Sequence, residues 1–140
     1  MTTPSIEAVI GHMLKNDRFS AWLGIELLEL DSGSCKISMT VRGEMMNGFD
    51  IAHGGIAFSF ADSALAIASN GYNKLSVALE TSMSFTAPVR SGDKLTATAT
   101  EISLTNRIGV YHILIANQDQ VTVGWFKGTV YRTSKTLLEL

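Results

Sequence analysis

The segment from Gly54 to Asn70 is apolar on almost every side of a helix, and this feature constrains the fold more than any other. Gly71 follows it as a stop signal. A helix without a solvent-facing side must be enclosed by other elements. The sequence therefore predicts a central helix with no solvent face, built from Ile56, Ala57, Phe58, Phe60, Ala61, Ala64, Leu65, Ala66, Ile67 and Ala68.

The remaining segments supply the enclosure. A first helix is expected over 5–23, with Ser5 as its cap and Gly24 as its stop. The stretch 42–52 lacks a clear period and is expected to be a loop. Runs with strand character lie at 25–30, 34–41, 75–87, 94–104, 109–117 and 121–132. This order predicts an α+β fold, in which one antiparallel sheet curls around the 54–70 helix in a single domain spanning 1–140.

Composition narrows the classes of partner and the compartment. The net charge is −2, and Lys and Arg are scattered singly, so neither nucleic acid nor anionic lipid is expected as a partner. No apolar run reaches the ~18–20 residues that a bilayer span needs, and no signal peptide is visible. The single cysteine, Cys35, lies in an alternating run and is expected to be a packed thiol. These features favour the cytoplasm.

Three polar residues interrupt the 54–70 helix: Ser59, Asp62 and Ser63. Their spacing places them on one side of the helix. An ionised carboxylate is costly to desolvate, so Asp62 is either a structural residue bonded to Ser59 or a neighbouring chain, or a group retained for chemistry.

The helix starts at His53-Gly54-Gly55, where the first backbone N–H groups have no partner within the helix. Two glycines leave these donors open to a substrate carbonyl, and such donors stabilise an oxyanion. The alternative is that the glycines serve only close packing at a turn. His53 either caps the helix or binds the same carbonyl.

Gly55 and Asp62 are about 10 Å apart along the helix axis, at ~1.5 Å per residue. One carbonyl cannot easily contact both groups. If both act on it, Asp62 must come from a second chain whose helix runs antiparallel to the first. The spacing therefore predicts a two-fold homodimer with two shared sites.

The loop before the helix adds Asn47, which either orients a water molecule or supports the turn at Asn47-Gly48. No Cys/His cluster or His-Glu-x-x-His pattern predicts a metal site. Phosphate-binding loops and the Gly-x-Ser-x-Gly elbow are likewise missing, so no nucleotide cofactor or serine nucleophile is expected.

Two runs around the helix start resemble the signature of PaaI-type hotdog thioesterases: Asn47-Gly48-Phe49-Asp50-Ile51-Ala52-His53-Gly54-Gly55 and Phe58-Ser59-Phe60-Ala61-Asp62-Ser63-Ala64. The stretches 87–93, 107–111 and 126–128 are similar to later segments of that family. The resemblance implies a hotdog fold, a homotetramer built as a dimer of dimers, and hydrolysis of acyl-CoA without a cofactor. It implies phenylacetyl-CoA and its ring-hydroxylated derivatives as leading substrates.

Carried over by position, the resemblance makes Asp62 the base or nucleophile and Gly55, with Gly54, the oxyanion donors. Asn47 and His53 would help to bind the carbonyl and place the water. One position departs from the family: some relatives have a water-orienting Ser where this chain has Ala78, and Ser63 is a possible substitute.

The CoA phosphates would need cationic partners, and the candidates are Arg90, Arg107 and Lys127, each of which could equally be a solvated charge. The acyl pocket could be lined by Met45, Met46, Phe49 and Phe58, or these could be plain core. Two other functions stay open. A non-catalytic acyl-CoA-binding module would not need Asp62, and a hotdog hydratase would pair an Asp with a His at a different spacing.

Overall fold

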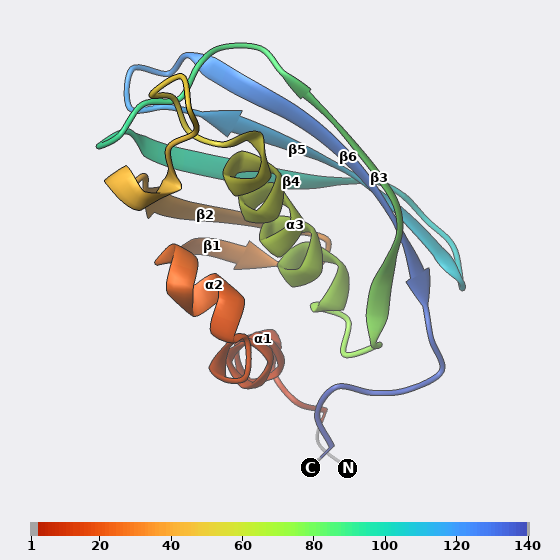
Figure 1. The fold of residues 1–140 in the computed structure, drawn as a ribbon. Coiled ribbons are helices and arrows are strands. Elements are labelled where there is room, and N and C mark those ends of the chain that lie inside the picture. Colours follow the sequence, from red (N-terminus) through yellow and green to blue (C-terminus); the bar gives the residue numbers. More distant parts are fainter. Residues whose placement is uncertain (1–2, 140) are drawn as a thin grey trace.

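The computed structural model describes residues 3–139, which form one antiparallel sheet and a long helix against its concave face (Figure 1). The sheet has six strands in the order β1-β2-β4-β5-β6-β3, and every neighbouring pair is antiparallel. This confirms the α+β class and the curled sheet. The strands are β1 Glu26–Asp31, β2 Ser34–Thr40, β3 Ser76–Phe85, β4 Lys94–Leu104, β5 Ile108–Ala116 and β6 Thr122–Arg132.

The central helix α3 spans Gly54–Asn70, as its apolar pattern predicts. It packs against β2, β3, β4, β5 and β6. Phe60, Ala61, Ala64 and Ile67 are fully buried on its sheet-facing side. Alternate residues of the strands complete the core, and those of β5 are Tyr111, Ile113 and Ile115.

The expected N-terminal helix over 5–23 is wrong in one respect, because it is broken in two. Helix α1 spans Ile6–Lys15 and α2 spans Arg18–Leu23. The break comes at Asp17, whose side chain accepts a hydrogen bond from the Ser20 backbone N–H at 3.0 Å and so begins a new helix. The outer ends agree with the expectation: Ser5 caps α1, and Gly24 ends α2 in the left-handed conformation at φ 78°.

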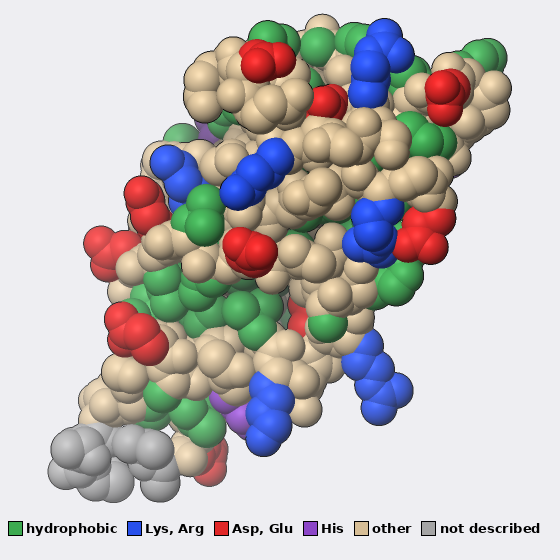
Figure 2. Space-filling model, turned by 90° about the vertical axis from the view of Figure 1, so that its left-hand side faces the viewer, with side chains coloured by type: hydrophobic (Ala, Val, Ile, Leu, Met, Phe, Trp, Pro, Cys, Tyr) green, Lys and Arg blue, Asp and Glu red, His purple; other side chains and the backbone are tan. Residues whose placement is uncertain are grey.

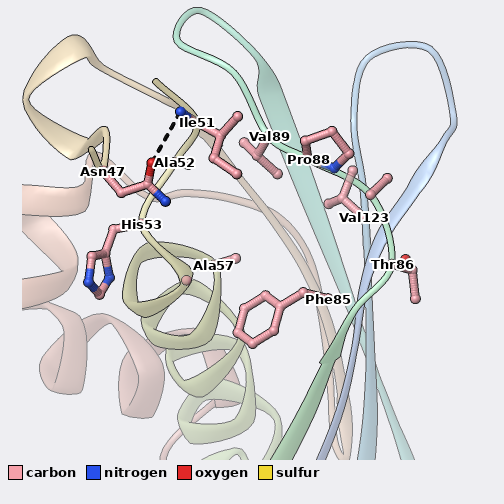
Figure 3. A pocket seen from close by; sticks show the side chains of 12 residues that line it. Asn47, Ile51, Ala52, His53, Ala57, Phe85, Thr86, Pro88, Val89 and Val123 are labelled. Carbon is pink, nitrogen blue, oxygen red and sulfur yellow. Dashed lines mark hydrogen bonds between the residues drawn. The ribbon is translucent and has the colours of Figure 1, made fainter. Parts of the chain in front are cut away.

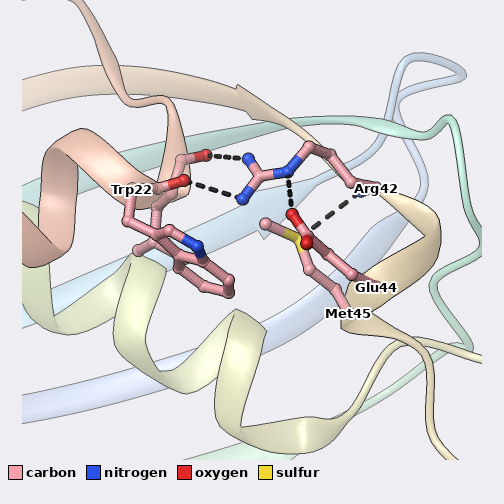
Figure 4. Close-up of polar contacts among 5 residues, drawn as sticks. Trp22, Arg42, Glu44 and Met45 are labelled. Carbon is pink, nitrogen blue, oxygen red and sulfur yellow. Dashed lines mark hydrogen bonds and ion pairs between the residues drawn. The ribbon is translucent and has the colours of Figure 1, made fainter.

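The loop at 42–52 is short of regular structure, apart from one 3₁₀ turn, η1, at Gly43–Met45. Arg42 anchors it to the end of α2 (Figure 4): its guanidinium donates to the carbonyls of Trp22 at 2.8 Å and Leu23 at 3.4 Å. The same group lies 4.9 Å from the centre of the Trp22 ring and pairs with Glu44 at 2.7 Å. The contacts of Arg42 with the end of α2 therefore fix the start of the loop that leads into α3.

Helix α3 is not fully enclosed by its own chain, which corrects the expectation drawn from its apolar pattern. A stripe along it stays open: Gly55 is exposed, and Phe58, Ser59, Asp62 and Ala66 are half-buried. At the start of α3, Phe85 at the end of the edge strand β3 is also exposed. One chain thus presents an open, largely apolar surface beside Asp62.

The face of the molecule drawn in Figure 2 shows no cluster of basic side chains. On the face drawn in Figure 2, hydrophobic side chains gather in one patch with acidic groups along its edge, while Lys and Arg stand apart from one another. No helix in the described part of the chain has both the length and the apolar character needed to cross a bilayer.

Cys35 is buried, and burial raises the pKa of its thiol to about 12, which confirms a packed thiol.

Candidate active site

His53 caps the start of α3. Its Nδ1 accepts a hydrogen bond from the Gly55 backbone N–H at 2.9 Å. An imidazole nitrogen that accepts must lack a hydrogen, so the neutral ring carries its hydrogen on Nε2. His53 is exposed, and this Nε2–H remains available as a donor to a ligand. The capping role and the ligand-binding role of His53 are therefore compatible.

The cap decides which N–H at the helix start is open. The Gly55 N–H is used by His53, whereas the Gly54 N–H has no hydrogen-bond acceptor within residues 3–139. Gly54 also has little room for a side chain, because a Cβ built on it would lie 3.2 Å from the Phe85 ring. Of the two expected oxyanion donors, the geometry favours Gly54 over Gly55.

A cavity of about 450 Å³ opens beside Gly54 (Figure 3). Most of its wall is apolar, and Asn47, His53 and Thr86 bring polar side chains to it. Its position beside the open N–H would suit a group attached to a carbonyl that accepts from this N–H. Its lining consists of Asn47, Ile51, Ala52, His53, Gly54, Ala57, Phe85, Thr86, Ala87, Pro88, Val89 and Val123.

Asn47 holds the loop that forms one wall of this cavity. Its side-chain oxygen accepts from the backbone N–H of Phe49 at 2.8 Å and of Ile51 at 3.4 Å. These bonds fix the turn, which was one of the two expected roles. The Asn47 amide nitrogen has no acceptor within the described residues, so it can still donate to a ligand.

Asp62 lies two turns further along α3, on the open stripe. Burial raises the pKa of its carboxyl, and the negative charge of Asp17 raises it further. Within residues 3–139 the Asp62 carboxylate has no hydrogen bond and no ion pair, so the bond to Ser59, one of the alternatives that the sequence leaves open, is not present. A narrow cavity of about 70 Å³ adjoins it, lined by Asp62, Leu65, Ala66, Ser69, Ser76, Ala78 and Val130.

One chain does not bring the helix start and the carboxylate together. The cavity at Gly54 does not include Asp62, and the cavity at Asp62 does not include Gly54. The helical rise of ~1.5 Å per residue separates Gly54 from Asp62 by about 12 Å. The geometry of one chain thus agrees with the expectation that the helix start and Asp62 can act on the same carbonyl only if they come from two different chains.

Ser63 faces inward, away from any ligand. It is 9% exposed, and its hydroxyl lies 2.8 Å from the Ser20 hydroxyl. The hydroxyl of Ser63 is thus engaged inside the chain, which does not favour the expected role in placing water. Ala78 lines the small cavity beside Asp62, where it offers no polar group.

The three expected phosphate-binding cations lie in different places. Arg90 is exposed and follows Val89, which lines the cavity at Gly54. Arg107 lies in the turn between β4 and β5 and donates to the Arg132 carbonyl at 3.1 Å. Lys127 lies on the outer side of β6, 3.9 Å from Glu80. Of the three, Arg90 alone directly follows a residue that lines the cavity at the helix start.

The four residues expected to line an acyl pocket also lie in different environments. Met45 is buried core, Phe49 is 85% exposed, and Met46 packs at the edge of the core. Phe58 is half-buried on the open stripe and packs edge-on against Phe126 at 5.3 Å between ring centres. None of the four lines the cavity at Gly54. They do not form one pocket within a single chain.

Phe85 is the functional candidate that the sequence does not reveal. It ends β3, is 57% exposed, and its ring lies over Gly54 (Figure 3). Its distance from the helix in sequence hides this contact, which depends on the end of β3 reaching the helix start. An alternating strand pattern shows that Phe85 lies on one face of the sheet but not what it meets there.

Comparison with known proteins identifies the family. Residues 49–124 match the model of the "Thioesterase superfamily". The chain is 40% identical to the acyl-coenzyme A thioesterase PaaI of Escherichia coli, over 89% of each chain, and 38% identical to a putative esterase of Archaeoglobus fulgidus, over 93% of this chain and 84% of that one.

A solved structure agrees with this match. The E. coli PaaI protein from the phenylacetic acid degradation operon superimposes with a TM-score of 0.93 and 38% identity, covering 95% of this chain and 96% of that one. The two chains share the hotdog fold. The chain belongs to the thioesterase superfamily and is a thioester hydrolase.

Proposed function

We propose that the chain hydrolyses acyl-CoA thioesters at a site shared between two copies, where Asp62 of one chain acts on a carbonyl held at the helix start of the other. The observation that carries this proposal is the Asp62 carboxylate itself. It is half-buried on an open stripe, its pKa is raised, and the described residues give it no partner. A carboxylate kept in this state costs stability, and a raised pKa makes it a better base or nucleophile.

The helix start of one chain and Asp62 of the other have different roles in the proposed reaction. The Gly54 N–H and the His53 Nε2–H would donate to the thioester oxygen and stabilise the negative charge that forms on it during attack. Asp62 either takes a proton from the water that attacks the carbonyl carbon, or attacks that carbon itself and forms a mixed anhydride that water then opens. In both cases the C–S bond breaks, the CoA thiolate leaves and takes up a proton, and the free acid is released.

The edge strand β3 supports a two-fold assembly. It is hydrogen-bonded only to β6, so the other edge of its backbone is unpaired within the described chain. Antiparallel pairing of two β3 edges would extend the sheet and place the open stripes of two α3 helices against each other. This arrangement would bring Asp62 of one chain to the helix start of the other. We further propose that two such dimers form a homotetramer.

Mixing two inactive variants tests the shared site. Asp62→Ala and Gly54→Pro should each be inactive alone, whereas dissociation and reassociation of an equal mixture should restore about a quarter of the wild-type activity, because half of the dimers are mixed and each mixed dimer holds one intact site. The measurement is thiol release from an acyl-CoA before and after mixing. Each variant carried through the same procedure alone is the control. Activity that stays at the level of the separate variants would place both groups in one chain's site.

Aromatic acyl groups, of the phenylacetyl and hydroxyphenylacetyl type, are the proposed substrates. The similarity to PaaI of a phenylacetic acid degradation operon supports this choice, as does the apolar wall of the cavity at Gly54. Burial of a ring in place of a methyl group should raise kcat/KM for phenylacetyl-CoA at least about tenfold above that for acetyl-CoA, at ~0.8 kcal/mol per buried CH₂. The buried Cys35 thiol supports the cytoplasm as the compartment.

A panel of acetyl-, hexanoyl-, phenylacetyl- and hydroxyphenylacetyl-CoA measures this preference by thiol release. Equal kcat/KM for the straight-chain and aromatic esters would contradict the aromatic preference while leaving the hydrolase intact. Negligible turnover of all four, with tight binding, would instead indicate a non-catalytic acyl-CoA-binding module.

A further inference from the structure

A chain of hydrogen bonds runs from the start of α2 to the residue beside Asp62. Asp17 accepts from the Ser20 backbone N–H at 3.0 Å through one carboxylate oxygen and from the Ser20 hydroxyl at 2.5 Å through the other. The Ser20 hydroxyl lies 2.8 Å from the Ser63 hydroxyl. Ser63 is the next residue after Asp62 on α3. The chain thus connects two helices next to the proposed catalytic carboxylate.

The direction of these bonds follows from the donors present. A hydroxyl has one hydrogen, and an ionised carboxylate can only accept. The Ser20 hydrogen therefore goes to Asp17, so Ser63 donates to Ser20. Ser20 and Ser63 are 3% and 9% exposed, which keeps water from replacing these bonds. The α3 turn that carries Asp62 is tied to α2 in one orientation.

Asp17 is also the charged group that acts on Asp62. The cavity on the β3 and β6 side of Asp62 has no titratable lining residue besides Asp62 itself: its other walls are Leu65, Ala66, Ser69, Ser76, Ala78 and Val130. On the α2 side, the negative charge of Asp17 adds to burial in raising the pKa of Asp62. In the proposed dimer, the second chain's helix start would face Asp62 with His53 and its open backbone donor.

We propose that Asp17 is a positioning residue for Asp62, because its hydrogen bonds through Ser20 to Ser63 fix the turn of α3 that carries the Asp62 carboxylate. The proposal rests on the proposed function, in which Asp62 is catalytic. Asp17 itself touches no substrate in this account. Asp17 makes two separable contributions, because its hydrogen bonds fix the helix turn that carries Asp62, whereas its charge acts on the Asp62 carboxyl.

The substitution Asp17→Asn removes the charge of Asp17 and keeps its hydrogen bonds. Asn caps helices about as well as Asp, so α2 should be retained. Its side-chain oxygen can accept from the Ser20 N–H, and its amide can donate to the Ser20 hydroxyl, which then donates to Ser63. The number of hydrogen bonds is kept and the charge is lost. Ser20→Ala does the opposite: it breaks the link to Ser63 and leaves the charge of Asp17 in place.

The experiment compares kcat/KM across pH for the wild type, Asp17→Asn and Ser20→Ala. The matched control is Asp119→Asn, which makes the same charge change in an exposed turn. Asp17→Asn should shift the acidic limb of the profile to lower pH and lower kcat on the plateau, with KM unchanged. Ser20→Ala should lower kcat by up to about 100-fold, as misplacement of a reacting group does, without moving the limb. Asp119→Asn should change neither.

A second readout does not depend on activity. The carboxyl carbon of Asp62, assigned by its loss in Asp62→Asn, can be titrated by ¹³C NMR, and its titration should move to lower pH in Asp17→Asn. The role of Asp17 would be overturned if, in Asp17→Asn, the titration of the Asp62 carboxyl and the acidic limb of the pH profile were the same as in Asp119→Asn. This holds even where Asp62→Asn is inactive. An active Asp62→Asn would instead contradict the proposed function, and the titration would still test the link. If Asp17→Asn fails to fold, Asp17→Ser, which also caps, replaces it.

Discussion

Replacement of Asp62 by Asn is expected to lower kcat by about 10²–10⁴-fold, the range that a positioned acid–base group contributes. Asn has nearly the same shape as Asp and keeps a polar end in the half-buried stripe, but it can neither take a proton from water nor attack the carbonyl. Because the described residues form no hydrogen bond to Asp62, the substitution breaks no internal hydrogen bond. KM should therefore change little, and steady-state thiol release separates the two parameters.

The same substitution should not destabilise the fold, and near neutral pH it should raise the melting temperature. The pKa of Asp62 is raised in the folded chain, so the folded state disfavours the charged form. As pH rises from the unfolded pKa through the folded pKa, the wild type loses stability that the Asn variant keeps. Thermal unfolding of both proteins at pH 3 and pH 7 should show the variant's advantage at pH 7 and a smaller difference at pH 3.

Ser59→Ala, on the same open stripe, is the matched control for Asp62→Asn. It removes a polar group one turn away and should leave kcat within a few-fold of the wild type. An Asn variant with wild-type kcat would remove Asp62 from the chemistry. An Asn variant that is both inactive and poorly folded would indicate a structural carboxylate, the alternative that the sequence leaves open.

Deletion of the open donor at the helix start should be nearly as damaging. Gly54→Pro removes the Gly54 N–H and is expected to lower kcat by about 10²–10³-fold, the effect of losing one oxyanion donor. Proline is well suited to the first position of a helix, where its missing N–H is unpaired in any case. His53, which precedes it, has φ −57° and ψ 135°, an extended conformation that a following proline favours. The helix should therefore form normally, as circular dichroism and melting temperature can verify.

Gly54→Ala is the control, because it introduces a side chain at the same place and keeps the N–H. Its Cβ would lie 3.2 Å from the Phe85 ring, which is exposed and can shift. The Pro variant should lose far more kcat than the Ala variant. Equal losses would mean that crowding against Phe85, and not the missing donor, is responsible. Normal kcat in both would return the donor role to Gly55.

The local pattern predicts the elements of the fold better than their arrangement. Helix α3 and β4 begin and end where their composition indicates, since apolar periodicity and turn residues act locally. The break between α1 and α2 depends on one side chain, Asp17, that caps from within an otherwise helical pattern. The place of β3 at the far edge, beside β6, follows from packing around α3, to which the order of the strands in sequence gives no guide.

In the candidate site, too, local features could be predicted from the sequence, whereas contacts between distant segments could not. Helical spacing is enough to separate Asp62 from the helix start, because it depends only on the rise of the helix. The roles of Gly54 and Gly55 could not be ranked from sequence, because the His53 ring chooses between their N–H groups. The inward contact of Ser63 differs from the expectation, and the contact of Phe85 with the helix start is not predicted from the sequence. In both cases the partner, Ser20 or Gly54, comes from a distant segment of the chain.

The pairing of β3 with β6 has a consequence for synthesis of the chain on the ribosome. Among the strands that the structure describes, β3 pairs with β6 alone, and β6 is made after β4 and β5, although β3 leaves the ribosome directly after α3. The nascent helix must therefore wait, with its apolar surface incompletely covered, until the segment up to Arg132 has emerged. Long-range strand pairing of this kind is slow to form. A pause in translation between β3 and β6 would lengthen the time for which this apolar surface is exposed.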